Sequence, residues 1–149
     1  MAIIRVTKEF NFEMAHALYN YDGMCKNIHG HSYKLFVTVI GNPITEPNHP
    51  KLGMLIDFGD LKALINKEIV KVFDHAFVIN KMSGFNNSDL SHEMFENTIY
   101  VDYQPTCENM ATDFVNRIKP ILPKSIKLFS LKLFETETAY AEWFASDNS

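Results

Sequence analysis

The most constraining feature of this sequence is an alternation of apolar and polar residues over residues 3–16. Side chains of one parity project from the same side of an extended strand, so the run predicts a long strand with one apolar face. The residues of that face are Val6, Phe10, Phe12, Met14 and His16. His16 continues the face either as a core histidine held by one hydrogen bond or as a functional group.

Two helices are expected in the middle of the chain, after a proline-containing loop at residues 45–53. The first begins at the N-cap Asp57 and ends at Asp74-His75, and the second begins at the N-cap Thr106 and ends at Lys119-Pro120. Apolar residues at helical spacing define the core stripe of the first helix. They are Phe58, Leu61, Ile65, Ile69, Val72 and Phe73.

Further strands are predicted over residues 31–40, 126–135 and 139–145. The order β-β-α-α-β-β is typical of an α+β fold in which two helices cover one side of an antiparallel sheet. We interpret residues 1–149 as a single domain. Residues 81–104 do not fit this plan and are interpreted as an insertion, polar and irregular at first and then a short strand at 97–103.

The other side of the predicted sheet is too apolar to face open water. Phe36, Ile40 and Trp143 are expected there. A large exposed apolar face marks an interaction surface, so we expect other subunits to cover it.

Composition narrows the function classes. The chain has 149 residues and a net charge of −4, and no block of Lys or Arg argues for a nucleic-acid partner. No apolar stretch is long enough to span a membrane, and the N-terminus lacks the apolar run of a signal peptide. Cys25 and Cys107 do not form a disulfide framework. A cytoplasmic protein with reduced thiols is the simplest interpretation.

A histidine pair, His29 and His31, indicates a metal site. In a strand the two imidazoles face the same way, with Gly30 adding no bulk between them. His16 would complete a three-nitrogen site with one open position, the pattern of a catalytic zinc, and neutral nitrogens favour zinc over magnesium or calcium. Cys25, four residues before the pair, is a fourth ligand, an inert thiol or a thiolate that accepts a proton.

Carboxylates and one more histidine are the remaining candidates. Asp74-His75 is either a helix cap or an acid/base pair. Glu135 continues the face of Phe129, Leu131 and Leu133, where it needs a partner or a function. It could accept two N–H groups from a flat heterocycle such as an amino-pyrimidine edge. At a helix start, Glu108 complements the helix dipole, and Cys107 is interpreted as packing.

Six ordered segments, spread over nearly the whole chain, form a specific set of motifs. They are Phe12-Glu13-Met14-Ala15-His16, Cys25-Lys26-Asn27-Ile28-His29-Gly30-His31, Gly53-Met54-Leu55-Ile56-Asp57-Phe58, Phe73-Asp74-His75, Pro105-Thr106-Cys107-Glu108-Asn109 and Glu135-Thr136-Glu137-Thr138-Ala139. This set resembles the 6-pyruvoyl-tetrahydropterin synthase family, and within it the bacterial branch of 6-carboxy-tetrahydropterin synthases.

The resemblance implies a fold, an assembly and site roles. The fold is the tunnelling fold, in which three subunits join their sheets into a barrel and two trimers stack into a hexamer with active sites between subunits. The zinc ligands would be His16, His29 and His31. The resemblance makes Cys25 the proton acceptor and His75 with Asp74 the acid/base relay. Glu135 would take part in catalysis and anchor the pterin, with Thr106 and Glu108 beside it in the substrate site.

The short gap between Cys25 and His29 favours the carboxy-tetrahydropterin branch, because the animal-type pyruvoyl enzymes have a longer one. A third branch of the family has an acid in place of this cysteine, so Cys25 argues against membership of that branch. The implied reaction converts 7,8-dihydroneopterin triphosphate to 6-carboxy-5,6,7,8-tetrahydropterin, acetaldehyde and triphosphate, on the pathway to queuosine and other 7-deazapurines. Two alternatives are a 6-pyruvoyl-tetrahydropterin synthase, which eliminates triphosphate without breaking a carbon–carbon bond, and a non-catalytic module that binds zinc or pterin.

Overall fold

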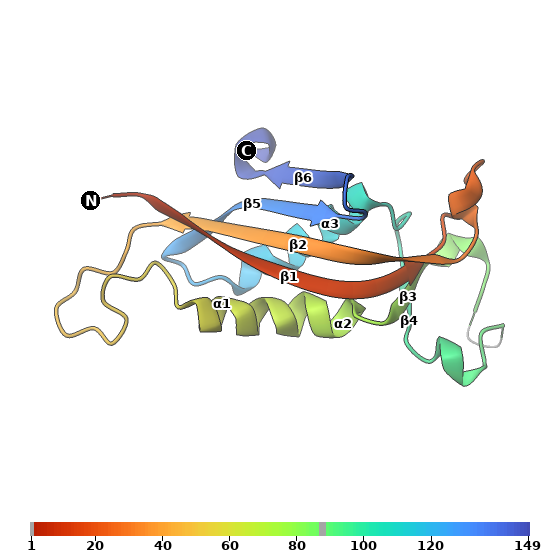
Figure 1. Ribbon diagram of the computed structural model, residues 1–149, viewed down its shortest axis with the longest axis horizontal. Coiled ribbons are helices and arrows are strands. Elements are labelled where there is room, and N and C mark those ends of the chain that lie inside the picture. Colours follow the sequence, from red (N-terminus) through yellow and green to blue (C-terminus); the bar gives the residue numbers. More distant parts are fainter. Residues whose placement is uncertain (1, 87–88) are drawn as a thin grey trace.

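A curled six-stranded sheet organises residues 2–86 and 89–149, the part of the chain that the computed structural model describes. The strand order is β4-β3-β1-β2-β5-β6 (Figure 1). The strands are β1 (Ile4–His16), β2 (His29–Gly41), β3 (Ala76–Asn80), β4 (Thr98–Val101), β5 (Ile126–Phe134) and β6 (Tyr140–Phe144). The antiparallel pair β1 and β2 forms the long axis of the sheet, and His16 lies opposite His29 at one end of it.

Two helical segments pack on one face of this sheet. The first is α1 (Phe58–Ile65), which continues through a π-helical turn (Asn66–Val70) into α2 (Lys71–Phe73). The second is α3 (Cys107–Ile118). Both predicted N-caps are confirmed, since the Asp57 carboxylate accepts from Gly59 N and the Thr106 hydroxyl from Asn109 N. None of the helices within the described residues has the length and apolar character needed to cross a membrane.

The buried residues of the first helical segment differ from the predicted stripe. They are Leu61, Ile65, Ile69 and Phe73, each four residues apart. Such a spacing drifts around an α-helix of 3.6 residues per turn, and the wider π turn reduces the drift. Phe58 was predicted in the core but is 52% exposed, because it begins the helix ahead of this row. Val72 is only partly buried.

One apolar core joins both helical segments to the sheet, which confirms the predicted α+β class with helices on one face. Phe12 of β1 stacks on Tyr33 of β2 at 5.1 Å and meets Phe114 of α3 edge-on. The apolar face predicted for residues 3–16 is therefore correct. Because the two strands are stiffened by this core, their ends have fixed positions.

The sheet is mixed rather than wholly antiparallel, because β3 runs parallel to β1 and β4 runs parallel to β3. Strand β3 was not predicted from the sequence. Ala76 and Val78 pack in the main core, whereas Phe77 and Ile79 pack in a second cluster with Phe95. Both faces of β3 are thus covered, and an apolar run without alternation gives no period-two signal.

Residues 81–97 connect these parallel strands and contain short turns of 3₁₀-helix at Lys81–Ser83 and Glu93–Phe95. A parallel pair requires such a crossover. The short strand expected at 97–103 is confirmed as β4. Asn87 and Ser88, which belong to the polar part of the predicted insertion, lie outside the described residues.

Two predictions about which side chains share a face were wrong. The register between β2 and β5 shifts by one residue, so Phe129 is the extra residue of a bulge and does not share the face of Leu131. The Phe129 ring contacts Arg5, whose guanidinium lies 3.8 Å from the ring centre. Trp143 pairs opposite Leu131 and packs against the main core, not on the opposite face. On that face, Phe36 contacts Phe134.

Candidate active site

Three histidines converge where β1 ends and β2 begins. The register of the hairpin places His16 opposite His29 and Met14 opposite His31, so the three rings gather on the core side of the sheet. One ligating nitrogen from each ring lies within 4.8 Å of the other two. His16 is only 1% exposed. The sequence prediction that these three residues form one group able to hold a metal ion is confirmed.

Backbone carbonyls fix the tautomers of two of these rings. His16 Nδ1 lies 2.7 Å from Pro105 O, and His29 Nδ1 lies 2.7 Å from Asn27 O. A carbonyl oxygen only accepts, so each Nδ1 carries the proton and each Nε2 presents a lone pair. The two Nε2 atoms lie 3.0 Å apart. Two lone pairs at this distance repel each other unless a cation lies between them, which is the arrangement of metal ligands.

His31 adds a third free nitrogen. Its Nε2 is buried and has no hydrogen-bond partner in the described part of the chain. Burial lowers the pKa of His31 and lowers that of His16 from 6.5 to about 4. Neutral imidazoles are the form that binds metal. The donor set therefore fits a zinc ion chemically.

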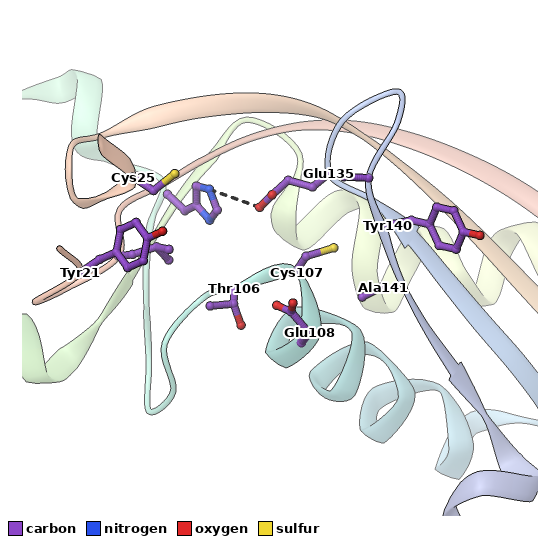
Figure 2. A pocket seen from close by; sticks show the side chains of 11 residues that line it. Tyr21, Cys25, Thr106, Cys107, Glu108, Glu135, Tyr140 and Ala141 are labelled. Atoms are coloured by element: carbon purple, nitrogen blue, oxygen red, sulfur yellow. Dashed lines mark ion pairs between the residues drawn. The ribbon is translucent and has the colours of Figure 1, made fainter. Parts of the chain in front are cut away.

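Glu135 lies on the turn between β5 and β6 and points toward the histidines. Its Oε1 is 3.6 Å from His16 Nε2 and 3.9 Å from His31 Nε2, and a dashed line in Figure 2 marks the first of these contacts. The turn is closed by hydrogen bonds from the amide nitrogens of residues 135 and 139, the latter to the Thr136 hydroxyl. The fold therefore places Glu135 at the histidine cluster, where its negative charge favours a cation among the three rings.

A pocket of about 280 Å³ opens beside His16 and gathers three distant parts of the sequence. Figure 2 shows the loop after β1, the start of α3 and the β5–β6 turn around it. Its lining includes Tyr21, Cys25, Thr106, Cys107, Glu108 and Glu135. Five predicted site residues therefore line one pocket, namely His16, Cys25, Thr106, Glu108 and Glu135.

Cys25 lies on a 3₁₀ turn, Met24–Lys26, at one side of this pocket and is partly buried. Within the described residues, the cluster of potential metal ligands consists of the three histidines and does not include this thiol. The geometry supports a free thiol at the wall of the pocket over a fourth metal ligand.

Asp74 and His75 form a pair, but they do not line the pocket. Asp74 Oδ2 lies 3.1 Å from His75 Nδ1, while its Oδ1 accepts from Glu13 N at 2.9 Å. The His75 side chain is 78% exposed and faces a separate hollow with Glu13, His31 and Ser32. Its φ of 61° is uncommon for a residue other than glycine, and such backbone strain often accompanies function.

The residues of the pocket wall that sequence reasoning missed include Tyr21 and Cys107. Tyr21 lies against Gly23, where an added Cβ would stand 2.5 Å from Tyr21 Cε1, so the glycine is the signal that could have found it. Cys107 was interpreted as packing only. Its thiol donates to Leu133 O at 3.2 Å, and burial raises its pKa to about 11, so it stays protonated at neutral pH.

The fold and the site together define a protein with three histidines able to hold a metal ion, and with a thiol and two carboxylates around one pocket. Residues 5–146 match the family model described as 6-pyruvoyl tetrahydropterin synthase. A protein of Haemophilus influenzae called 6-carboxy-5,6,7,8-tetrahydropterin synthase is 34% identical, covering 95% of this chain and 99% of that protein. A Rickettsia conorii protein of the same name is 32% identical, covering 94% and 99%.

The solved structures agree on the fold. The 6-pyruvoyl tetrahydropterin synthase of Caenorhabditis elegans has a TM-score of 0.68 at 21% identity, covering 97% of each chain. This likeness confirms the predicted tunnelling fold for the single chain. The chain belongs to the 6-pyruvoyl tetrahydropterin synthase family. Both the predicted family and the prediction of an enzyme are thus confirmed.

Proposed function

We propose that this chain is a zinc-dependent lyase that converts 7,8-dihydroneopterin triphosphate and water to 6-carboxy-5,6,7,8-tetrahydropterin, acetaldehyde and triphosphate. The observation that carries the proposal is the convergence of two fixed Nε2 lone pairs and the unpartnered His31 Nε2 beside a pocket with a free thiol. The relatives that bear the carboxy-tetrahydropterin name match over nearly their whole length, which supports the same reaction here.

The chemistry divides among the residues around the pocket. Zinc held by His16, His29 and His31 would supply Lewis acidity toward the hydroxyls of the substrate side chain, which eases proton removal from the adjacent carbons. Cys25, which lies on the loop after β1, accepts one of these protons. Glu135 accepts N–H groups from the pterin edge, and Thr106 and Glu108 extend the same wall at the start of α3.

The relay of His75 and Asp74 serves the pocket of a neighbouring subunit. Two observations support this arrangement: His75 is largely exposed, and its hollow is lined by residues other than those around Cys25. A homohexamer built as a dimer of trimers provides such a neighbour. It also covers the aromatic face where Phe36 meets Phe134.

The product identifies the reaction. Zinc-loaded protein is incubated with 7,8-dihydroneopterin triphosphate, and the products are separated and weighed by mass spectrometry. Acetaldehyde with 6-carboxy-5,6,7,8-tetrahydropterin supports the proposal. A pyruvoyl product without acetaldehyde would instead assign the 6-pyruvoyl-tetrahydropterin synthase reaction, and tight binding without turnover would assign a binding module. A chelator-treated sample is the control and is expected to be inactive until zinc is restored.

Cys25 is tested by substitution. Cys25→Ala is expected to lower kcat by roughly 10²–10⁴, the usual loss for one positioned proton-transfer group, while zinc content stays equal to that of the wild type. Loss of zinc from Cys25→Ala would make the cysteine a ligand and would contradict the assigned role. Cys107→Ala is the matched control, because the Cys107 thiol already donates a hydrogen bond to Leu133 O. The zinc content of this variant should be unchanged.

We place this activity in the cytoplasm, on the pathway to queuosine and other 7-deazapurines. The pathway assignment follows from the proposed product and has its own test. Deleting the gene should abolish queuosine in transfer RNA, and supplying 6-carboxy-5,6,7,8-tetrahydropterin should restore it.

A further inference from the structure

One side chain fastens the loop that carries Cys25 to the start of α3. Gln104 Nε2 donates to Tyr19 O at 2.6 Å, and Tyr19 N donates to Gln104 Oε1 at 3.0 Å. The amide group therefore pairs with both backbone atoms of a residue 85 positions earlier in the chain. Each of these polar groups has a single well-directed partner, so the pair fixes both distance and orientation.

The loop side of this pair leads directly to the thiol. Leu18 N donates to Cys25 O at 2.9 Å, which closes the loop at its base. Tyr21 N in turn donates to Leu18 O at 3.2 Å. Tyr19, held by Gln104, thus belongs to a compact turn whose other end carries Cys25.

The helix side leads to the metal ligands and the substrate wall. The carbonyl of Gln104 accepts from Thr106 N at 2.7 Å and from Asn109 Nδ2 at 3.0 Å. The next residue, Pro105, holds His16 Nδ1 through its carbonyl. One short segment therefore orients a metal-ligating ring, begins the helix with Thr106 and Glu108, and holds the thiol loop.

We propose that Gln104 is a positioning residue that sets the place of the Cys25 thiol relative to the three histidines. The effect on rate rests on the proposed function, whereas the effect on the thiol does not. The side chain of Gln104 has no direct role toward substrate in this arrangement, because its Oε1 and Nε2 both form hydrogen bonds with the Tyr19 backbone. It acts through the loop.

Two substitutions remove the clamp in different ways. Gln104→Met keeps the length of the side chain and loses both hydrogen bonds. Gln104→Glu keeps an oxygen that accepts from Tyr19 N. It replaces the donor Nε2 with a second oxygen, so the hydrogen bond to Tyr19 O becomes a repulsive contact between two oxygens. Asn148→Ala is the matched control, because it removes one amide-to-carbonyl bond, Asn148 Nδ2 to Phe144 O at 2.9 Å, at the C-terminal turn. Circular dichroism and zinc content establish that each variant is folded and loaded.

The readout is the rate at which iodoacetamide modifies Cys25 in the zinc-loaded protein, with Cys25 and Cys107 distinguished by peptide mass spectrometry. Both Gln104 variants should raise the Cys25 rate by about fivefold to a hundredfold, the range that loss of two ordinary hydrogen bonds allows. On the proposed substrate, kcat should fall by roughly tenfold or more because the proton acceptor is misplaced. KM should change less, because Tyr21 moves with the turn but Thr106, Glu108 and Glu135 lie outside it.

The inference is overturned if Gln104→Met leaves the Cys25 rate within about twofold of the wild type, or if Asn148→Ala raises it equally. A wild-type protein that does not turn over dihydroneopterin triphosphate would contradict the proposed function alone. The alkylation rates would still decide whether Gln104 positions the thiol.

Discussion

The protonation state of His16 follows from its surroundings at the scale of single residues. Burial is the largest cause that lowers its pKa to about 4, and the neighbouring His29 and His31 lower it further. The hydrogen bond to Pro105 O opposes this shift without reversing it. A buried neutral imidazole with its proton on Nδ1 is ready for a metal, but it is a site where acid weakens the fold.

The metal-free protein should therefore lose stability as the pH falls. Between pH 6.5 and about 4 the unfolded chain binds a proton at His16 and the folded chain does not, so the free energy of unfolding decreases with falling pH in this window. The His16 contribution is roughly 3 kcal/mol at most. Urea unfolding of the apo protein at several pH values measures it. His16→Gln should flatten the slope, and an unchanged slope would contradict this account.

Gly23 is a second residue whose role can be tested directly. Adding a Cβ would place it 2.5 Å from Tyr21 Cε1, and the φ of Gly23 is −108°, so the conflict is with a side chain and not with the backbone. Because Tyr21 is 46% exposed, its ring can move away. Gly23→Ala should cost less than about 1 kcal/mol of stability while changing KM several-fold through the displaced ring.

The double variant Gly23→Ala with Tyr21→Ala separates the two effects. If Gly23 acts only through Tyr21, adding Gly23→Ala to Tyr21→Ala should change KM no further. Additive effects on KM would show that Gly23 affects the pocket by another route.

The elements differ in how well the sequence predicts them, and the reason is how many of their faces are covered. Strand β1 has one covered face within the chain, so alternation predicted it. The β-branched and aromatic residues of β2 predicted that strand, and the spacing of His29 and His31 placed both on one side of it. Strand β3 is covered on both faces, by the main core and by the cluster of Phe77 and Ile79, and left no alternation to detect. In β5 the bulge at Phe129 reverses the parity, so the pattern placed that side chain on the wrong face.

Helix α3 provides a test at the scale of an element, because its first turn also forms part of the pocket. The Thr106 hydroxyl accepts from Asn109 N at 3.2 Å and caps the helix. Thr106→Ala should lower the free energy of unfolding by about 0.5–2 kcal/mol, the range for loss of an N-cap oxygen. Thr106→Ser keeps the oxygen and should remain near the wild type in chemical denaturation. Equal stability of the Ala and Ser variants would exclude a capping contribution.

For the whole molecule, the sequence identified most of the site, but it could not place its parts relative to one another. The three histidines are local to one hairpin, and spacing alone brought His29 and His31 together. Glu135 comes from the far end of the chain, and only the fold places it within 4 Å of His16 and His31. Gln104 carried no motif signal, since its role arises from a contact between distant segments. His75 is the exception, because within one chain it lines a different hollow from Cys25.

A mixing experiment tests whether the site is shared between chains. Cys25→Ala and His75→Asn chains are each expected to be inactive, and asparagine is chosen at position 75 because it tolerates the positive φ. When the two chains are unfolded together in equal amounts and refolded with zinc, about one quarter of the sites should combine an intact Cys25 with an intact His75 from a neighbour. Activity should recover to that fraction. A chain with both substitutions, mixed equally with wild type, should also leave about one quarter of the sites active, against about one half if each chain acted alone. No recovery in the first mixture and half activity in the second would place both residues in one chain's site and contradict the shared arrangement.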